Sequence, residues 1–161
     1  MIVNRLKQRR KPDQRGQTMV EFALAFPILL ILVLGIFEFG RLFITYTSVY
    51  AAAREGARFG AAAENLPTCG AGIQSNADRV GFLAVGMNVT HTYDHGPGTG
   101  TFSCNGGGTN LKLGDRVLVT ASVTGFESII GLFPPLNISS QAKRTIITNV
   151  YLLQPIPTPS K

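Results

Sequence analysis

The densest group of chemically active side chains in the sequence is His91-Thr92-Tyr93-Asp94-His95, with two imidazoles and a carboxylate within five residues. Imidazole and carboxylate groups serve in general acid–base catalysis and as zinc ligands. A catalytic zinc site needs three protein ligands, and the sequence holds only two histidines. The segment therefore predicts a polar loop or strand end and no cofactor, with a fortuitous metal contact at His91 and His95 as the alternative.

Cys69 and Cys104 are the two cysteines of the sequence, and both lie in stretches rich in Gly, Pro, Ser and Thr. Two cysteines permit one pairing, and in an oxidising compartment a disulfide between them would close a loop of 34 residues. Closing a loop of that length stabilises a small domain by roughly 3–4 kcal/mol. Two unpaired buried thiols are the alternative.

The sequence lacks the motifs of common enzyme classes. No serine stands in a Gly-x-Ser-x-Gly elbow, and Gly96-Pro97-Gly98-Thr99-Gly100 departs from the dinucleotide-binding fingerprint. We therefore expect that the protein is not an enzyme.

The net charge of +6 is concentrated at the amino terminus. Residues 1–16 hold six Lys or Arg side chains against Asp13 alone, which leaves the other 145 residues with a net charge of +1. Phosphate binding requires a basic stripe interleaved with aromatic side chains, and residues 17–161 have neither such a stripe nor a tryptophan. The charge pattern therefore argues against nucleic-acid binding.

The elements that position these groups begin with an apolar run, Phe22–Phe37, sixteen residues without a charge. Nineteen residues separate Glu21 from Arg41, and a helix of that length spans about 28 Å, close to the thickness of the hydrocarbon core. Because the basic residues precede the run, the positive-inside rule places residues 1–16 in the cytoplasm and sends residues 45–161 across the membrane. The run predicts a single transmembrane helix over residues 17–44.

A cleaved secretory signal peptide is the competing interpretation. The run is longer than the core of most signal peptides, and Glu38 and Arg41 follow it where small residues should mark a cleavage site. We interpret Glu38 and Arg41 as an ion pair, three residues apart, at the outer membrane surface. Pro27 lies inside the run and must be accommodated within the helix.

Glu21 is the acid at which the leader meets the apolar run, five residues after Gly16. By itself Glu21 is typical of a helix start, where a carboxylate complements the helix dipole. In Arg15-Gly16-Gln17-Thr18-Met19-Val20-Glu21-Phe22, a basic leader ends in glycine, and an acid and a phenylalanine follow at the fifth and sixth positions after it. In this arrangement the sequence resembles a type IV prepilin, and most closely the TadE-like pseudopilins of the tight-adherence (Tad, or Flp) branch. The resemblance continues through Gly35–Arg41 and Ala52–Arg58.

The resemblance, which covers about residues 14–62, implies how the protein is processed and assembled. A prepilin peptidase would cut between Gly16 and Gln17, leaving the apolar helix in the cytoplasmic (inner) membrane. The new ammonium of Gln17 would then be neutralised by Glu21 of a neighbouring subunit, with Phe22 beside it, when helices pack into a bundle. The implied partners are the peptidase, other pilin and pseudopilin subunits, the pilus assembly platform and the lipid bilayer.

Beyond residue 44 the sequence predicts an α+β body. Small and apolar residues recur at spacings of three and four through Arg41–Glu64, so we expect the helix to continue to residue 64. Its expected buried side consists of Leu42, Tyr46, Val49, Ala53, Gly56 and Gly60. Gly56 and Gly60 are spaced for close approach to another helix or to a sheet, which indicates a helix-packing role.

A second helix is expected at Ile73–Val85, followed by strands that form an antiparallel sheet packed on the long helix: Met87–Tyr93, Arg116–Val123 and Ala142–Tyr151. Gly96–Gly108 predicts an exposed loop anchored by Cys104. The expected organisation is a leader (1–16), a transmembrane helix (17–44), a helix continuation (45–64), an exported sheet-containing domain (65–153) and a mobile proline-spaced tail (154–161).

The leading hypothesis for function is a minor pilin or pseudopilin that is incorporated into an assembly through its amino-terminal helix. The runner-up is a single-pass, membrane-anchored binding module that keeps its leader. A membrane-anchored hydrolase that uses His91 and His95 is the third hypothesis.

Overall fold

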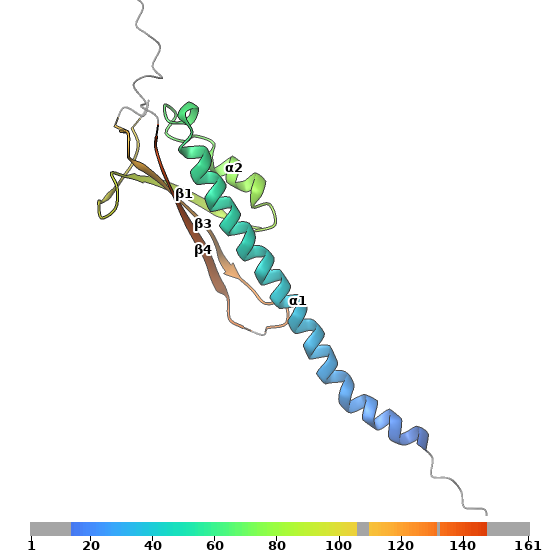
Figure 1. The fold of residues 1–161 in the computed structure, drawn as a ribbon. Coiled ribbons are helices and arrows are strands. Elements are labelled where there is room, and N and C mark those ends of the chain that lie inside the picture. Colours follow the sequence, from blue (N-terminus) through green and yellow to red (C-terminus); the bar gives the residue numbers. More distant parts are fainter. Residues whose placement is uncertain (1–13, 106–109, 132, 148–161) are drawn as a thin grey trace, which may run out of the picture. The chain divides into compact units, whose positions relative to one another are not determined.

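The computed structural model describes residues 14–105, 110–131 and 133–147 (Figure 1). The chain divides into two compact units, Met1–Phe39 and Gly40–Lys161. One long helix, α1 (Gln14–Gly60), supplies the described part of the first unit and continues into the second. The predicted leader before residue 14 and the predicted tail lie outside the described residues.

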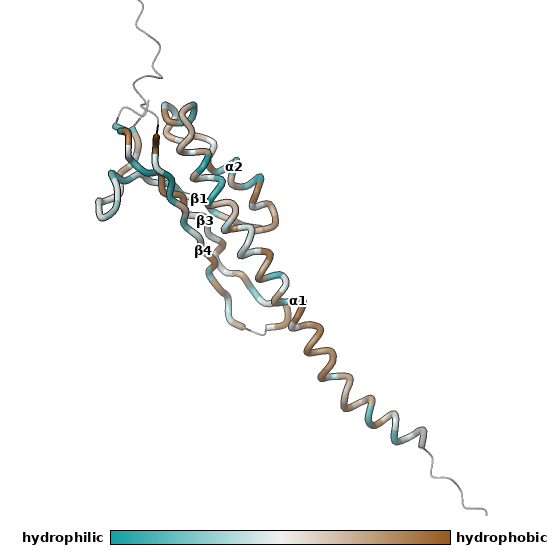
Figure 2. The backbone as a smooth tube through the Cα atoms, in the orientation of Figure 1, coloured by the Kyte–Doolittle hydropathy of each residue, from teal (hydrophilic) through white to brown (hydrophobic). Residues whose placement is uncertain are grey.

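The first unit is helical because its residues are mostly Leu, Ile, Ala and Phe, which tolerate or favour helix, and Pro27 lies within the helix as expected. Every residue from Gly16 to Val33 is exposed. Among the described residues, α1 is the one helix long and apolar enough to cross a membrane. Figure 2 shows this part of α1 mainly in brown, the colour of hydrophobic residues.

The second unit contains a four-stranded antiparallel sheet in the order β2-β1-β3-β4. Its strands are β1 (Asn88–Asp94), β2 (Thr101–Phe102), β3 (Arg116–Phe126) and β4 (Leu136–Thr145). Val119 of β3 stands between His91 of β1 and Ala142 of β4, which defines the register of the three longer strands. The α+β fold class predicted from the sequence is therefore confirmed.

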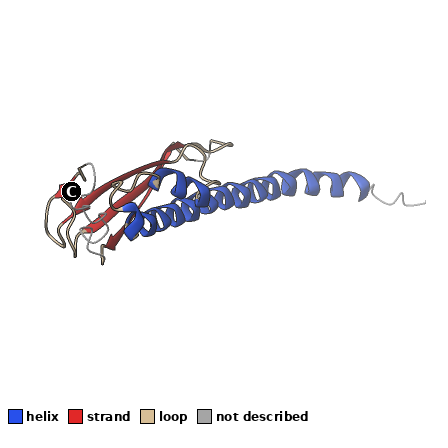
Figure 3. Cartoon of the chain, turned by 90° about the horizontal axis from the view of Figure 1, so that it is seen from above, coloured by secondary structure: helices blue, strands red, loops and turns tan. Residues whose placement is uncertain are grey.

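The core of the second unit lies between the sheet and two helices, the outer part of α1 and the short helix α2 (Ile73–Val80). Figure 3 shows both helices on the same side of the sheet. Alternate residues of β3 face this side, and those at 117, 119, 121 and 123 are buried. The helices contribute mainly small or branched side chains to the same core: Val49, Ala52, Ala53, Ala57, Ile73 and Ala77.

Gly56 and Gly60 bring α1 close to both the sheet and α2. A Cβ atom on Gly60 would lie 2.7 Å from Cδ1 of Ile73 and 3.1 Å from Cγ2 of Val117. A Cβ atom on Gly56 would lie 3.0 Å from Cγ1 of Val119. The two glycines therefore face packed side chains of their own chain, where a larger residue would have to displace a neighbour.

The predicted helix boundaries were wrong by a few residues. Helix α1 ends at Gly60 and not at residue 64, and a single 3₁₀ turn, η1 (Ala63–Asn65), follows it. Helix α2 ends at Val80, five residues before the predicted end, because Gly81 caps it by donating its backbone N–H to the carbonyl of Ala77 at 2.8 Å. Tyr46 was expected on the buried side, but its side chain is 54% exposed.

The last strand was also misplaced. The sequence suggested Ala142–Tyr151 because its residues alternate in strand fashion, whereas β4 begins at Leu136 and ends at Thr145. Pairing with β3 through a hairpin sets this register, and residues 148–151 lie outside the described part of the chain. The predicted Gly96–Gly108 loop contains the short strand β2, which pairs with the end of β1.

Candidate functional site

The proposed processing junction lies in the first two turns of α1. Gly16 is helical and exposed, and a Cβ atom there would meet no other atom within 4 Å. The side-chain amide Nε2 of Gln17 donates a hydrogen bond to Oε1 of Glu21 at 3.2 Å, because residues four apart are neighbours on a helix. The exposed Glu21 carboxylate is thus within hydrogen-bonding reach of Gln17, the residue that would become the amino terminus after cleavage between Gly16 and Gln17.

Phe22, the other predicted assembly residue, is 65% exposed, and its ring lies 5.5 Å from the ring of Phe26 between centroids. Glu38 is buried. The expected ion pair between Glu38 and Arg41 joins residues of the two separate units and stays a prediction.

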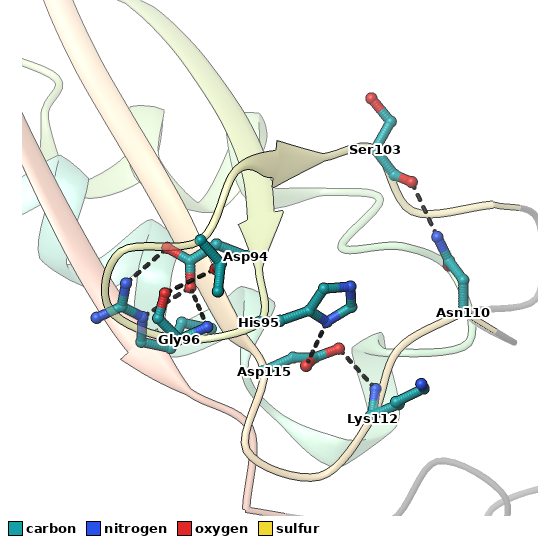
Figure 4. A network of polar contacts seen from close by, with 9 residues as sticks. Asp94, His95, Gly96, Ser103, Asn110, Lys112 and Asp115 are labelled. Atoms are coloured by element: carbon teal, nitrogen blue, oxygen red, sulfur yellow. Dashed lines mark hydrogen bonds and ion pairs between the residues drawn. The ribbon is translucent and has the colours of Figure 1, made fainter.

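A disulfide joins Cys69 to Cys104, with an Sγ–Sγ distance of 2.04 Å. Cys69 lies in the turns between α1 and α2, and Cys104 follows β2. The bond therefore ties the end of the helical layer to the edge of the sheet. Beside it, Asn110 donates its side-chain amide to the carbonyl of Ser103 at 3.0 Å (Figure 4).

Asp94 is engaged by Arg116, which stands directly opposite it on β3. The guanidinium donates two hydrogen bonds of 2.7 Å to the carboxylate, from Nε to Oδ1 and from Nη2 to Oδ2, and the backbone N–H of Gly96 donates a third at 3.0 Å (Figure 4). The Arg116 hydrogen bonds hold the pKa of the Asp94 carboxyl below its usual value, against the opposing effect of desolvation. Asp94 is therefore an ionised cross-strand anchor.

His95 contacts a different carboxylate. Its Nδ1 lies 2.9 Å from Oδ1 of Asp115, whose Oδ2 accepts the backbone N–H of Lys112 at 2.8 Å. The His95 ring stacks on Phe102 with 4.4 Å between centroids. These contacts fasten the loop after β1 to the turn before β3 (Figure 4).

His91 turns to another part of the fold. Its Nε2 lies 3.1 Å from the carbonyl oxygen of Cys69, and its ring meets the Tyr93 ring edge to face at 6.0 Å. The two histidines thus have separate partners and do not converge. Within residues 14–105, 110–131 and 133–147, no group of three His, Cys, Asp or Glu side chains is placed to hold a metal ion.

Tyr93, between the two histidines, is almost wholly buried. Burial raises its pKa to about 12, and among the described residues its hydroxyl has no hydrogen-bond partner. Sequence reasoning did not single out Tyr93, Phe102, Asp115 or Arg116. Antiparallel pairing of the predicted strand Met87–Tyr93 with the predicted strand that starts at Arg116 would have brought Asp94, the residue after the first strand, close to Arg116.

Two concavities open on the described surface of the second unit. One, of about 310 Å³, is lined by α1, the segment after α2 and the end of β3, and includes Arg41, Ile44 and Phe126. The other, of about 330 Å³, lies between α1 and β4 and is lined by Arg54, Lys143 and Arg144 among others. The first is mainly apolar and the second is basic.

Comparison with known proteins locates the similarity in the long helix. The family model described as TadE-like protein matches residues 16–58. The match begins at Gly16, ends inside α1 and covers roughly a quarter of the chain, so the sheet lies outside it. No curated protein and no solved structure matches the chain.

Proposed function

We propose that this chain, a TadE-like protein of the Tad pilus system, works as a minor pilin or pseudopilin that is anchored and assembled through helix α1. The main support for the proposal is that three boundaries fall at nearly the same place in the sequence. The family match begins at Gly16, the basic leader ends there, and the fully exposed apolar part of α1 begins within the next turns. An apolar helix that exposes its side chains all round requires lipid or other helices around it.

In this proposal residues 1–16 are cytoplasmic, α1 crosses the cytoplasmic membrane once, and the sheet-containing unit is exported. The six basic side chains of the leader support this orientation. The Cys69–Cys104 disulfide supports it independently, because disulfides persist in oxidising compartments outside the cytosol.

The proposed processing step is hydrolysis of the Gly16–Gln17 peptide bond by a prepilin peptidase. Cleavage would turn the amide nitrogen of Gln17 into an ammonium group beside the membrane. Glu21 is exposed, and the hydrogen bond that it accepts from Gln17 is long and comes from a neutral amide, so its carboxylate is accessible to an ammonium of a neighbouring subunit. Pairing would offset much of the cost of bringing both charges into a helix bundle.

The proposed role is structural and not catalytic. His91, Asp94 and His95 support it, because each is held by a contact that links segments of the fold: the carbonyl of Cys69, the guanidinium of Arg116 and the carboxylate of Asp115. A site for acid–base chemistry would instead direct these groups towards a shared reacting atom.

Intact-mass spectrometry of the protein extracted from membranes tests the processing step. The wild-type chain is expected to begin at Gln17, whereas an anchored binding module would retain residues 1–16. Gly16→Val should slow cleavage roughly a hundredfold, since a displacement of about 1 Å at a reacting group can cost that factor and a side chain at this position blocks close backbone approach. The same spectrum shows whether the new amine is free, because cyclisation of an amino-terminal glutamine releases one ammonia.

Gly35→Val is the matched control. A Cβ atom at Gly35, like one at Gly16, meets no other atom within 4 Å, so neither change should disturb the fold of the chain. Gly35→Val should be cleaved normally. A wild-type protein that supports pilus assembly with residues 1–16 still attached would refute the processing step and favour the anchored binding module.

A further inference from the structure

Two loops of the second unit expose large apolar side chains. In the loop after α2, Phe82 and Leu83 are exposed and Val85 is 87% exposed. In the loop after β3, Ile130 is exposed and Ile129 is 66% exposed. Single apolar residues on a surface are ordinary, but a cluster of them indicates an interaction site.

Both loops lie beside the same turn of α1. Leu83 and Val85 line the concavity of about 310 Å³ together with Ile44 of α1 and Phe126 at the end of β3. The guanidinium carbon of Arg41 lies 5.1 Å from the centre of the Phe126 ring.

Phe126 also stacks on Phe133 at 6.3 Å, so the two ends of the loop that carries Ile129 and Ile130 are joined, and the β3 end lies beside α1 (Figure 1). Leu83, Val85 and Ile44 therefore share one concavity, and the loop that carries Ile129 and Ile130 begins at Phe126, which lines the same concavity.

This end lies where α1 leaves its apolar run. Arg41 closes the nineteen-residue stretch that begins after Glu21, and Ile44 follows within one turn. The interfacial layer on each side of the hydrocarbon core is roughly 5–8 Å thick, about the height of one helical turn. In the proposed anchoring, Arg41 and Ile44 therefore lie in that layer, and Leu83 and Val85, which line the same concavity, lie close to it.

The charge pattern agrees with a lipid surface. Residues 80–93 contain no Asp, Glu, Lys or Arg, and the loop after β3 carries one charged residue, the exposed Glu127 two residues before Ile129, while Arg41 supplies a cation at the concavity. Arg54, the basic residue that α1 contributes to the second concavity, lies roughly 20 Å farther along α1 than Arg41, too far to touch the same headgroups. Apolar side chains next to a cation are the combination that favours the membrane interface.

We propose that Ile44, Phe82, Leu83, Val85, Ile129 and Ile130 form an apolar collar that inserts into the outer interface of the bilayer and seats the exported domain on the membrane. The inference rests on the proposed membrane anchoring through α1 and adds a second lipid contact, made by the exported domain itself. The collar stabilises the subunit in the membrane before assembly and has to leave the lipid when the subunit is extracted into a filament.

The absence of tryptophan from the sequence makes the collar directly measurable. Full-length Val85→Trp and Ile129→Trp variants are reconstituted separately into phosphatidylcholine–phosphatidylglycerol vesicles, with or without phosphatidylcholine brominated along its acyl chains. Each variant is expected to show blue-shifted emission and to lose roughly half or more of it to the brominated lipid, because indole rings reside at the interface.

Leu113→Trp is the matched control. Leu113 is also apolar and exposed, and it precedes β3, whereas Phe126 ends β3. The eleven residues of the strand separate the two sites by roughly 30 Å, so emission from position 113 should remain water-like and unquenched.

Flotation of the vesicles distinguishes a failure of the collar proposal from a failure of the proposed α1 anchor. A Val85→Trp or Ile129→Trp chain that floats with the vesicles while its introduced indole stays water-exposed would overturn the collar and leave the α1 anchor intact. A chain that does not float would overturn the anchor and the collar together. A blue shift that the brominated lipid does not quench, and that disappears as protein is diluted in lipid, would assign the surface to a neighbouring subunit and overturn the lipid contact.

Discussion

Asp94 and Arg116 face each other across β1 and β3, and their two short hydrogen bonds join the side chains at the end of the sheet. The same short segment holds His91 and His95, whose partners lie on other loops. At the scale of single residues, these aspartate and histidine side chains therefore link separate segments of the fold. The charge of Asp94 makes the stability of the fold depend on pH. The Asp94–Arg116 ion pair is the interaction through which this dependence is best measured.

Asp94→Asn should reduce the thermal stability of the full-length protein in nonionic detergent at neutral pH. The folded-state pKa of Asp94 is lowered, so the pair contributes its stability above the unfolded pKa of about 4 and loses it as the pH falls through the lower folded value. The difference in melting temperature between wild type and variant should therefore be constant near pH 7 and shrink below about pH 4.

Glu55→Gln is the control for this measurement. Arg58 also holds the pKa of Glu55 below its usual value, but that pair is exposed on the surface of α1 and within one helix. Exposed pairs of this kind contribute little, so the melting temperature should barely change. An Asp94→Asn difference that persists unchanged into acid would show that lost packing, and not the charge, is responsible.

At the scale of elements, the outer part of α1 packs through its smallest residues. Gly56 and Gly60 lie against β3 and α2, and the neighbouring Ala52, Ala53 and Ala57 are buried in the same layer. Because these residues add little side-chain bulk, the helix approaches the sheet closely, and the approach depends on the absence of a Cβ at two positions.

Gly60→Val should destabilise the second unit by about 1–3 kcal/mol, the usual cost of overpacking a filled core. Its new side chain would meet Ile73 and Val117 at distances that require one of them to move. Denaturant unfolding of the full-length protein in detergent, followed by far-UV circular dichroism, measures the change.

Gly40→Val is the comparison, because a Cβ atom at Gly40 meets nothing within 4 Å. Its effect should stay within about 0.5 kcal/mol, as for surface changes generally. Equal unfolding midpoints for the two variants would contradict the close packing at Gly60.

At the scale of the whole molecule, the chain combines an apolar helical segment that is exposed from Gly16 to Val33 with a second unit that has its own core and disulfide. A domain with its own core folds without help from neighbours, whereas an exposed apolar helix gains stability from lipid and from other helices. Folding and assembly should therefore be separable by mutation.

Glu21→Ala should impair incorporation into the assembly about tenfold or more, as the loss of roughly 1.4 kcal/mol per subunit contact would produce, because an ammonium at Gln17 would be left unpaired among helices. Disulfide formation and flotation with membranes should be unchanged. The measurement is the amount of subunit co-purified with sheared filaments relative to the amount in membranes. Glu55→Ala, which removes a partly exposed carboxylate from the second unit, should be incorporated normally. Normal incorporation of Glu21→Ala would show that the proposed pairing is wrong.

Local features of the sequence were sufficient to predict the apolar helix, the disulfide and two of the strands. The helix over the apolar run follows from composition alone, since consecutive apolar residues without a charge leave few other structures available. The disulfide required only that two cysteines share an oxidising compartment, and β3 was recognisable because Arg116–Val123 alternates in strand fashion in the sequence. The chain ends of β1 and β3 were also located within a few residues.

The tertiary structure alone decided which distant segments stand opposite one another. It placed Arg116 across from Asp94, shifted β4 to Leu136–Thr145, and gave His91 and His95 different partners. It also placed the loop after α2 and the end of β3, about forty residues apart in the sequence, beside the turn of α1 at Ile44. The physical reason is the same in each case: the pairing depends on strand register and on packing between elements far apart in the sequence, which no local pattern of residues encodes.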